Sequence, residues 1–501
     1  MTSSSEPHLV VQSPHAVAAD VLALPVFELD TLDDSTWLPD VLRGEVRRLL
    51  DAQTFRAKLG ETFFLRAEGM AASYLGLVGA GKRSEWSIER FRRVASCAGL
   101  TARQRGWRQL ALVVRVTGLD RGAELQGATE GLVLSTFDAD SLKTTPREAV
   151  ALAGSVVVGL AGDEAFDVDV AAGRVLGEAA NLARRLANEP GNLLPPRVLA
   201  ERAVAVATNA GLPVDVLEDA EMAGLGMGLL LGVARGSAEA PRLIVIRYEP
   251  EGGRAEGAPV LGLVGKGVTF DTGGISIKPA DGMDRMKNDM TGGAAVIGAM
   301  HAIARLRPPI AVVGVVPAVE NMPGGRALKP GDVLTSASGK TVEVNNTDAE
   351  GRLILGDALW YARRLGATHL VDVATLTGSC AVALGRVASG LFGTVDWWST
   401  LVRDTAAEAG DFVWPLPLHE EFGEQLRSEI ADVINTGSRW GGASTAAMFL
   451  KEFVGDVPWV HLDIAGTAWS DEARPWQPKG PNPVATRTLA RLAFTSHRWP
   501  R

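Results

Sequence analysis

Five short apolar runs, each as long as a buried β-strand, place the strongest constraint on how this chain can fold. They span residues 243–248, 260–264, 310–316, 370–373 and 459–464. Segments of helical periodicity separate them, and continuous apolar runs of this length are typical of strands buried on both faces. The pattern therefore predicts an α/β domain whose central mixed sheet is covered by helices.

The first third of the chain shows the same alternation on a smaller scale. Strands are predicted at residues 21–26, 63–65, 73–79, 110–116 and 150–160, with helices between most of them. A helical pattern over residues 168–188 ends before Pro190 and Gly191, which terminate helices. We therefore expect a disordered tail at residues 1–18, a smaller N-terminal α/β domain at 19–164, a connecting helix at 165–192 and a larger C-terminal α/β domain at 193–501.

Composition narrows the classes of partner. The formal net charge of −9 argues against nucleic acid or an anionic membrane as the main partner. The two cysteines, Cys97 and Cys380, provide no disulfide framework, and residues 1–14 lack a signal-peptide pattern. No stretch approaches the ~20 apolar residues that span a bilayer. We therefore expect a cytoplasmic protein that does not associate with membranes.

Two carboxylates lie close together between a predicted strand at residues 342–344 and a predicted helix at 353–364. Asp348 and Glu350 are two residues apart, so in an extended segment both side chains point to the same side. Arg352 can continue that side if the extension persists. Taken alone, this pattern fits a solvated acidic turn with a surface ion pair equally well.

A second polar stretch follows the predicted strand at residues 260–264. It holds Lys266 and Asp271 among glycines that permit close backbone approach, and Asp289 directly precedes a predicted helix. Open α/β sheets bind their ligands beyond the carboxyl ends of strands. We therefore expect this stretch and the downstream acidic pair to build one site.

The chemistry of such a site follows from its charge. Four carboxylates in a partly buried pocket cannot all stay ionised unless positive charge is added, and two divalent cations would supply it. Oxygen ligands suit Mn²⁺, Mg²⁺ or Zn²⁺, whereas the absence of an H-E-x-x-H motif argues against a histidine-based zinc protease. His461 is predicted to be a core histidine. Lys266 can offset charge as an ammonium or ligate a metal as a neutral amine, and the sequence does not choose between them.

The two polar stretches resemble the signature of the leucyl aminopeptidase (cytosol aminopeptidase) family, a group of two-metal exopeptidases. The matching residues are 265–267, 270–274, 278–279, 289–290, 346–353 and 374–378. The resemblance implies a catalytic metallopeptidase domain at residues 193–501. It also implies an enzyme that releases N-terminal amino acids, preferably Leu and other apolar residues, from peptide substrates.

The resemblance further implies a role for each matching position. One of two divalent cations (Mn²⁺ or Zn²⁺) would be held by Lys266, Asp271, Asp289 and Glu350, and the other by Asp271, Asp348 and Glu350. Asp289 would lie near the α-amine of the substrate, and Lys278 would hold the developing oxyanion. Arg352 would hold a bicarbonate that serves as general base.

Specificity and assembly are also implied by the resemblance. Met286, Thr375, Gly378, Ala465 and Ala468 would line the pocket for the substrate side chain. Ala468 is small where relatives can carry methionine, so the pocket is expected to be wider than leucine needs. Relatives form hexamers, which implies a homohexamer here.

Two alternatives stay open. Acidic two-metal sites also hydrolyse phosphate esters, so a dimetal phosphohydrolase is the first. Residues 76–83 nearly match a P-loop, but Arg83 stands where Ser or Thr would hold Mg²⁺, and a glycine turn is predicted there instead. The second is an N-terminal domain that binds nucleic acid or an ADP-ribose-like ligand, supported by the arginines of residues 82–108. A solvated helix face or an intersubunit surface is a simpler explanation of those arginines than nucleic-acid binding in a chain of negative net charge.

Overall fold

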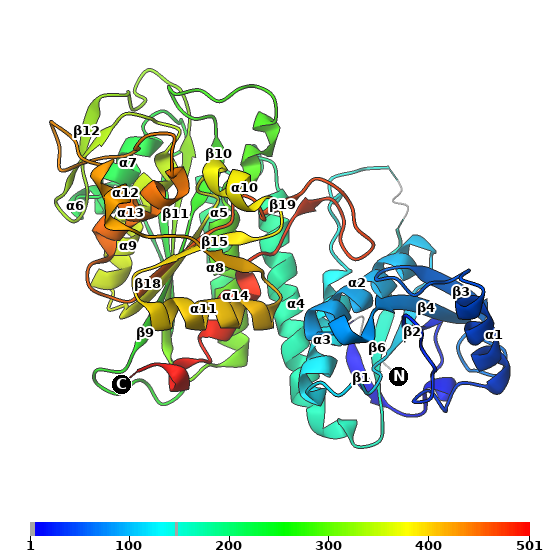
Figure 1. The fold of residues 1–501 in the computed structure, drawn as a ribbon. Helices are drawn as coiled ribbons and strands as arrows, with labels where there is room; N and C mark the ends of the chain where they lie inside the picture. The colour runs from blue at the N-terminus through cyan, green and yellow to red at the C-terminus, as the bar shows by residue number, and fades with distance from the viewer. Residues whose placement is uncertain (1–5, 146–148, 501) are drawn as a thin grey trace. The chain divides into compact units, whose positions relative to one another are not determined.

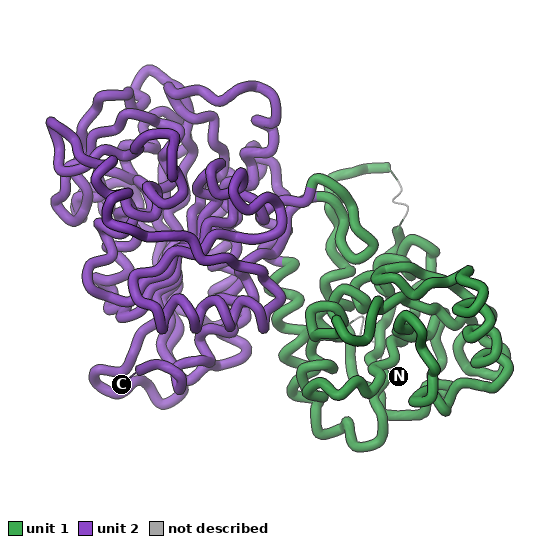
Figure 2. Tube along the Cα trace, in the orientation of Figure 1, with its two compact units in different colours: residues 1–181, 471–479 green, residues 182–470, 480–501 purple. Residues whose placement is uncertain are grey.

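The computed structural model describes residues 6–145 and 149–500, and the chain divides into two compact units (Figures 1 and 2). The first unit comprises Met1–Asn181 and Asp471–Lys479, and the second comprises Leu182–Ser470 and Gly480–Arg501. The division falls inside the long helix α4 (Asp167–Asn188). A short segment from the C-terminal part of the sequence thus belongs to the first unit, which the pattern of strands and helices did not predict.

The first unit is built on a six-stranded sheet in the order β1-β6-β5-β2-β4-β3. All neighbouring strands are parallel except β3, which runs antiparallel to β4. The strands are β1 (His8–Val11), β2 (Val21–Phe27), β3 (Thr62–Arg66), β4 (Tyr74–Gly81), β5 (Gln109–Val113) and β6 (Gly154–Gly159). Helix α1 (Asp40–Asp51) covers one face, and α2 (Ile88–Gln104) and α3 (Arg121–Leu134) cover the other.

Two local expectations about this unit are wrong. Residues 8–11 form strand β1, paired in parallel with β6, so main-chain hydrogen bonds order part of the predicted tail; residues 1–5 of that tail lie outside the described residues. The glycine run at 76–81 lies within β4, where a side chain at Gly79 would collide with the Lys58 carbonyl oxygen. Glycine serves close packing there, which leaves the phosphate-loop alternative without support.

The arginines of α2 are also less solvated than predicted. Arg92 and Arg103 are buried, and the Nε atom of Arg92 lies 2.5 Å from a carboxylate oxygen of Glu130 on α3. Arg103 donates to the carbonyl oxygen of Ser135 at 2.6 Å. Buried guanidinium groups are stable only when acceptors surround them, and α3 supplies these acceptors. These two arginines therefore join helices rather than form a basic surface.

The second unit contains a nine-stranded mixed sheet with the path β16-β15-β18-β14-β9-β11-β8-β7, and β10 pairs with β11 beyond the end of β9. Strands β9, β11, β14 and β18 run parallel, while β8, β7 and β15 introduce antiparallel pairs. The strands are β7 (Val214–Leu217), β8 (Arg242–Tyr248), β9 (Val260–Gly265), β10 (Gly267–Asp271), β11 (Ala311–Asn321), β14 (His369–Ala374), β15 (Ser389–Gly393), β16 (Val413–Pro415) and β18 (Trp459–Asp463).

Helices cover both faces of this sheet, as predicted (Figure 1). Helices α7 (Gly228–Ala234), α9 (Glu350–Arg364) and α13 (Gly442–Val454) share one apolar core with the sheet. Helices α5 (Pro196–Asn209), α8 (Thr291–Leu306), α11 (Asp396–Ala409) and α14 (Thr486–Leu492) pack on the other face. The remaining elements are α6 (Asp219–Gly224), α10 (Gly378–Leu384), α12 (Glu420–Glu424), the small sheet of β12 (Asp332–Thr335), β13 (Thr341–Val344) and β17 (Val433–Ile434), and the pair β19 (Trp469–Ser470) and β20 (Gly480–Pro481).

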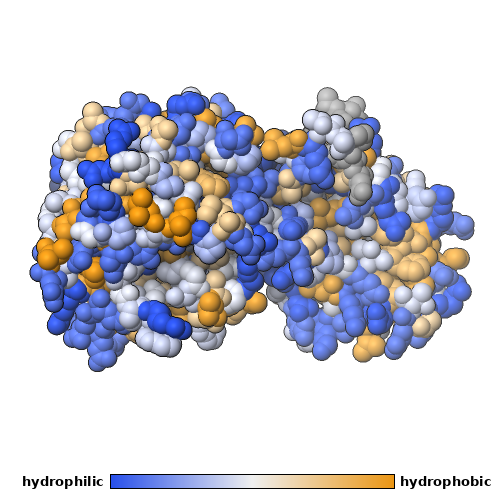
Figure 3. All heavy atoms as spheres, turned by 90° about the horizontal axis from the view of Figure 1, so that it is seen from above, coloured by the Kyte–Doolittle hydropathy of each residue, from blue (hydrophilic) through white to orange (hydrophobic). Residues whose placement is uncertain are grey.

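Among the helices of the described ranges, none is long and apolar enough to cross a bilayer. On the face shown in Figure 3, apolar residues are interspersed with hydrophilic ones. Scattered exposed apolar residues of this kind are ordinary on a folded protein.

Candidate active site

The carboxyl ends of the parallel strands bring the predicted site residues together. Lys266 follows β9 directly, and Asp271 is the last residue of β10. Asp289 lies two residues before the start of α8, and Glu350 is the first residue of α9. A Cβ atom at Gly351 would lie 2.8 Å from the Nζ atom of Lys266, so glycine is required for α9 to approach this lysine.

Two details of this arrangement differ from the predictions. Asp271 ends a strand rather than lying in a loop, because residues 267–271 pair with β11. Asp348 lies in a turn and Glu350 begins a helix, so the extended geometry expected for this segment is wrong. The change from turn to helix nevertheless places both carboxylates toward the same point.

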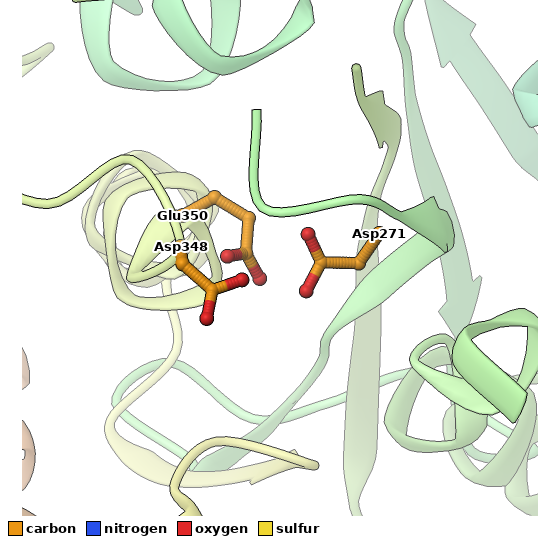
Figure 4. A group of neighbouring side chains, drawn as sticks. All are labelled: Asp271, Asp348 and Glu350. Atoms are coloured by element: carbon orange, nitrogen blue, oxygen red, sulfur yellow. The ribbon is translucent and has the colours of Figure 1, made fainter. Parts of the chain in front are cut away.

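Three carboxylates form the centre of the site (Figure 4). Asp271, Asp348 and Glu350 each offer an oxygen atom, and these atoms all lie within 4.8 Å of one another. Asp271 and Glu350 are buried, whereas Asp348 is partly exposed. Such a group of oxygen donors is able to hold a hard divalent cation.

Lys266 is enclosed by acceptors. Its Nζ atom lies 2.8 Å from Asp289, 2.8 Å from Glu350 and 3.0 Å from the carbonyl oxygen of Thr375. Three acceptors match the three N–H bonds of an ammonium group. Burial opposes the charge of Lys266, but the neighbouring carboxylates outweigh burial and raise its pKa. In the structure, Lys266 is therefore placed as a buried ammonium.

Lys278 bridges the other pair of acids. Its Nζ atom lies 2.7 Å from Asp271 and 2.5 Å from Asp348. Burial lowers the pKa of Lys278, but Asp271 and Glu350 raise it by more. The Lys278 side chain keeps 20% of its surface exposed, compared with 4% for Lys266. Lys278 is therefore the ammonium of this pair that a substrate can reach.

The two ammonium groups of the site do not neutralise its four carboxylates. Four carboxylates face two ammonium groups, and burial together with the neighbouring Glu350 charge raises the pKa of Asp271 to about 6. Burial also raises the pKa of Asp289 to about 8, although Lys266 opposes the shift. Burial disfavours the ionised form of Asp271 and Asp289 more than the two ammonium groups favour it, whereas for Glu350 burial is outweighed by Lys266 and Lys278, which lower its pKa. The donor set therefore fits divalent metal ions, which would supply further positive charge.

A cavity of about 630 Å³ opens over this cluster. Of the predicted site residues, those that line it are Lys266, Asp271, Lys278, Met286, Asp289, Asp348, Glu350, Thr375, Gly378 and Ala465. Arg352 and Ala468 are not among its lining residues. Ala468 is buried, and its N–H donates to the carbonyl oxygen of Ile464.

Arg352 lies outside the lining of the cavity. It is buried in α9, and its Nη1 atom donates to the carbonyl oxygen of Asn435 at 2.7 Å. Burial lowers the pKa of Arg352 to about 10, although Glu350 opposes the shift. Its Nε atom is buried and has no hydrogen-bond acceptor in the structure. A buried guanidinium with an unused donor fits an anion.

Several residues that organise the site were missed by the sequence reasoning. The Asn321 amide donates to Asp271 at 2.9 Å and to the carbonyl oxygen of Thr347 at 3.0 Å, so it ties the two acidic segments together. The Asn435 amide donates to the carbonyl oxygen of Asn346 at 2.8 Å. A polar residue at the end of a buried strand was the only available signal for Asn321. The sequence held no signal for Asn435.

His461 behaves as predicted for a core histidine. It is fully buried in β18, and its Nδ1 atom lies 2.6 Å from Asp372 on β14. The Nε1 atom of Trp459 donates to the same carboxylate at 2.6 Å. Burial lowers the pKa of His461, but Asp372 raises it by more. This histidine is therefore part of a buried polar pair rather than of the acidic centre.

Acidic oxygen donors and two lysines at the carboxyl edge of a mixed α/β sheet are typical of a metal-dependent hydrolase. Two family models match the chain: the catalytic domain of the cytosol aminopeptidase family over residues 181–490, and the N-terminal domain of that family over residues 23–146. The chain therefore belongs to the cytosol aminopeptidase family of metal-dependent aminopeptidases, as the sequence predicted.

Individual relatives agree with the family assignment. The chain is 49% identical over 478 residues to a probable cytosol aminopeptidase of Solibacter usitatus, an alignment that covers 95% of this chain and 97% of the relative. It superposes with a TM-score of 0.84 on the bottromycin maturation enzyme BotP in complex with Mn, at 35% identity, covering 95% and 99% of the two chains. A mutant of tomato leucine aminopeptidase gives a TM-score of 0.87 at 33% identity, covering 99% and 97%.

Proposed function

We propose that this enzyme removes Leu and other apolar residues from the free N-terminus of peptides, using two divalent metal ions. One ion would be held by Lys266, Asp271, Asp289 and Glu350, the other by Asp271, Asp348 and Glu350. The convergence of three carboxylate oxygens within 4.8 Å carries this proposal. Mn²⁺ or Zn²⁺ suits these donors, and the similarity to a structure that contains Mn supports manganese. Ligation by Lys266 requires loss of the proton that it holds in the present geometry.

The metal ions would supply Lewis acidity toward the scissile carbonyl and the attacking water. The chain's own residues supply the rest. Asp289, at the wall of the cavity, accepts a hydrogen bond from the substrate α-amine and so selects a free N-terminus. Lys278 donates to the carbonyl oxygen as negative charge develops there.

Arg352 and the cavity wall complete the proposal. A bicarbonate at Arg352 would supply a general base, and the unused Nε donor supports an anion at this position. Met286, Thr375, Gly378 and Ala465 would contact the substrate side chain because they line the cavity. Ala468 is buried and does not line the cavity, so its small size would widen the pocket indirectly. Good turnover of Phe- and Met-amides beside Leu-amide would follow.

We also propose a cytoplasmic homohexamer whose catalytic domain spans residues 193–501. Family membership supports this assembly, and sedimentation of the purified chain at the mass of a monomer would exclude it. The second unit contains all the cavity residues.

Hydrolysis of Leu-p-nitroanilide before and after chelation tests the function. Activity should disappear with chelation and return with Mn²⁺, because the carboxylates cannot act without added charge. Asp348→Asn should abolish the activity, since it removes one of the three central carboxylates. A chelated enzyme that keeps its full rate, or an Asp348→Asn variant that does, would exclude the proposed two-metal mechanism.

A further inference from the structure

A buried carboxylate outside the acidic centre holds two segments of the cavity wall. Asp463, the last residue of β18, is 1% exposed and does not line the cavity itself. Its Oδ1 atom accepts from the backbone N–H groups of Leu376 (3.2 Å), Thr377 (3.4 Å) and Ala465 (3.1 Å). Its Oδ2 atom accepts from the Thr377 hydroxyl at 2.6 Å. Four donors thus converge on one carboxylate, which satisfies a charge that is costly to bury otherwise.

The segments that Asp463 holds contact both the acidic centre and the substrate cavity. Thr375 accepts from Lys266 through its carbonyl oxygen, and its hydroxyl donates to Asp289 at 2.7 Å. Thr375, Leu376, Thr377 and Ala465 all line the cavity. Asp463 therefore fixes, from behind, two stretches of wall that are about 90 residues apart in sequence.

The Thr377 hydroxyl extends this control to a third stretch. It donates to Asp463 and accepts from the backbone N–H of Cys380 at 3.0 Å, which caps the start of α10. Ala381 and Val382 of α10 also line the cavity. The orientation of α10 is thus linked to the same carboxylate.

We propose that Asp463 is a positioning residue for specificity: it sets the shape of the pocket that receives the side chain of the N-terminal residue. This inference rests on the proposed aminopeptidase function. An amide at this position keeps one acceptor oxygen and gains a donor, which would face either the three backbone N–H groups or the Thr377 hydroxyl. Asp463→Asn therefore releases part of the wall. A loosened wall contacts a large side chain less well, whereas a methyl group makes few contacts to lose.

The test compares Leu-p-nitroanilide with Ala-p-nitroanilide on the metal-loaded full chain. We expect Asp463→Asn to reduce kcat/KM for the leucyl substrate by about 10-fold or more, and for the alanyl substrate by less than about 3-fold. Most of the loss should lie in KM. Asp372→Asn is the matched control, because Asp372 is an equally buried carboxylate on the neighbouring strand whose partners are Trp459 and His461. The Asp372→Asn variant should keep the wild-type ratio of kcat/KM for the leucyl and alanyl substrates.

Thr377 supplies the second pair of variants, which keeps the inference testable if Asp463→Asn does not fold. Thr377→Val removes the hydroxyl and should lower the leucyl-to-alanyl ratio, whereas Thr377→Ser keeps the hydroxyl and should restore it. Calorimetric titration of Mn²⁺ into the chelated variants checks metal loading, since poorer loading lowers kcat/KM equally for both substrates. An active wild type whose ratio survives in Asp463→Asn, or in Thr377→Val where the former cannot be folded, overturns this inference. A wild type inactive on both substrates overturns the proposed function instead.

Discussion

Lys278→Met separates two roles that the geometry allows for this lysine. Its ammonium lies between Asp271 and Asp348, and it is more exposed than Lys266. If Lys278 donates to the developing oxyanion, its loss should lower kcat by about 10²–10³, or about 2.7–4 kcal/mol of transition-state stabilisation. If it only offsets the acids, its loss should affect stability and metal affinity, because charged hydrogen bonds of this kind contribute about 1.5–3 kcal/mol each.

The assay measures kcat and KM for Leu-p-nitroanilide at saturating Mn²⁺, so that a change in metal affinity does not enter kcat. Saturation matters because Lys278 lowers the pKa of Asp271, which burial has already raised to about 6, so loss of the Lys278 charge changes the affinity of these carboxylates for cations. Lys278→Arg keeps a cation that donates hydrogen bonds, so it should recover part of the lost rate. A kcat within about threefold of the wild type in Lys278→Met would refute the oxyanion role, since one missing donor costs much more.

Two further perturbations follow from buried groups. Asp372 raises the pKa of His461 despite burial, so this pair stabilises the fold fully below the unfolded pKa of histidine and less as pH rises through the folded value. Asp372→Asn should therefore cost about 3 kcal/mol of unfolding free energy near pH 6 and less at alkaline pH; denaturant titrations that show the opposite trend contradict this. Ala468→Met should narrow the pocket, cost about 1–3 kcal/mol by overpacking, and reduce Phe-amide turnover relative to Leu-amide; an unchanged ratio of these two rates would count against the wide pocket.

Strands and acidic residues were the predictable part of this molecule. The apolar run at residues 260–264 became β9, because a continuous apolar segment of that length is stable mainly when both faces are covered. Lys266, Asp271, Asp289, Asp348 and Glu350 could be grouped because four of them follow a predicted strand and the fifth precedes a helix. Strand ends and helix starts meet at one edge of such a sheet, whatever the length of chain between them.

The unpredicted part depends on contacts between distant segments. Three side chains bind backbone groups of loops that lie 26 to 89 residues away: Asn321, Asn435 and Asp463. Because nearly every residue carries the same backbone groups, the sequence does not show which of them a side chain will bind. Asp271 ends a strand only because β11 continues past β9 and provides a partner. Helix α9 begins at Glu350, three residues before the predicted start at residue 353, so Arg352 lies in the helix and donates to the carbonyl oxygen of Asn435. Local periodicity cannot show which of these alternatives long-range packing selects.

The two lysines explain how four acids can be folded into one pocket before any metal ion binds. Each lysine joins an acid of the upstream segment to one of the downstream segment: Lys266 contacts Asp289 and Glu350, and Lys278 contacts Asp271 and Asp348. Opposite charges therefore alternate, and each of these four carboxylates has a lysine ammonium beside it. The compensation is incomplete, because two ammonium groups cannot balance four carboxylates. The fold thus tolerates the site as it stands, and its remaining negative charge would attract divalent cations.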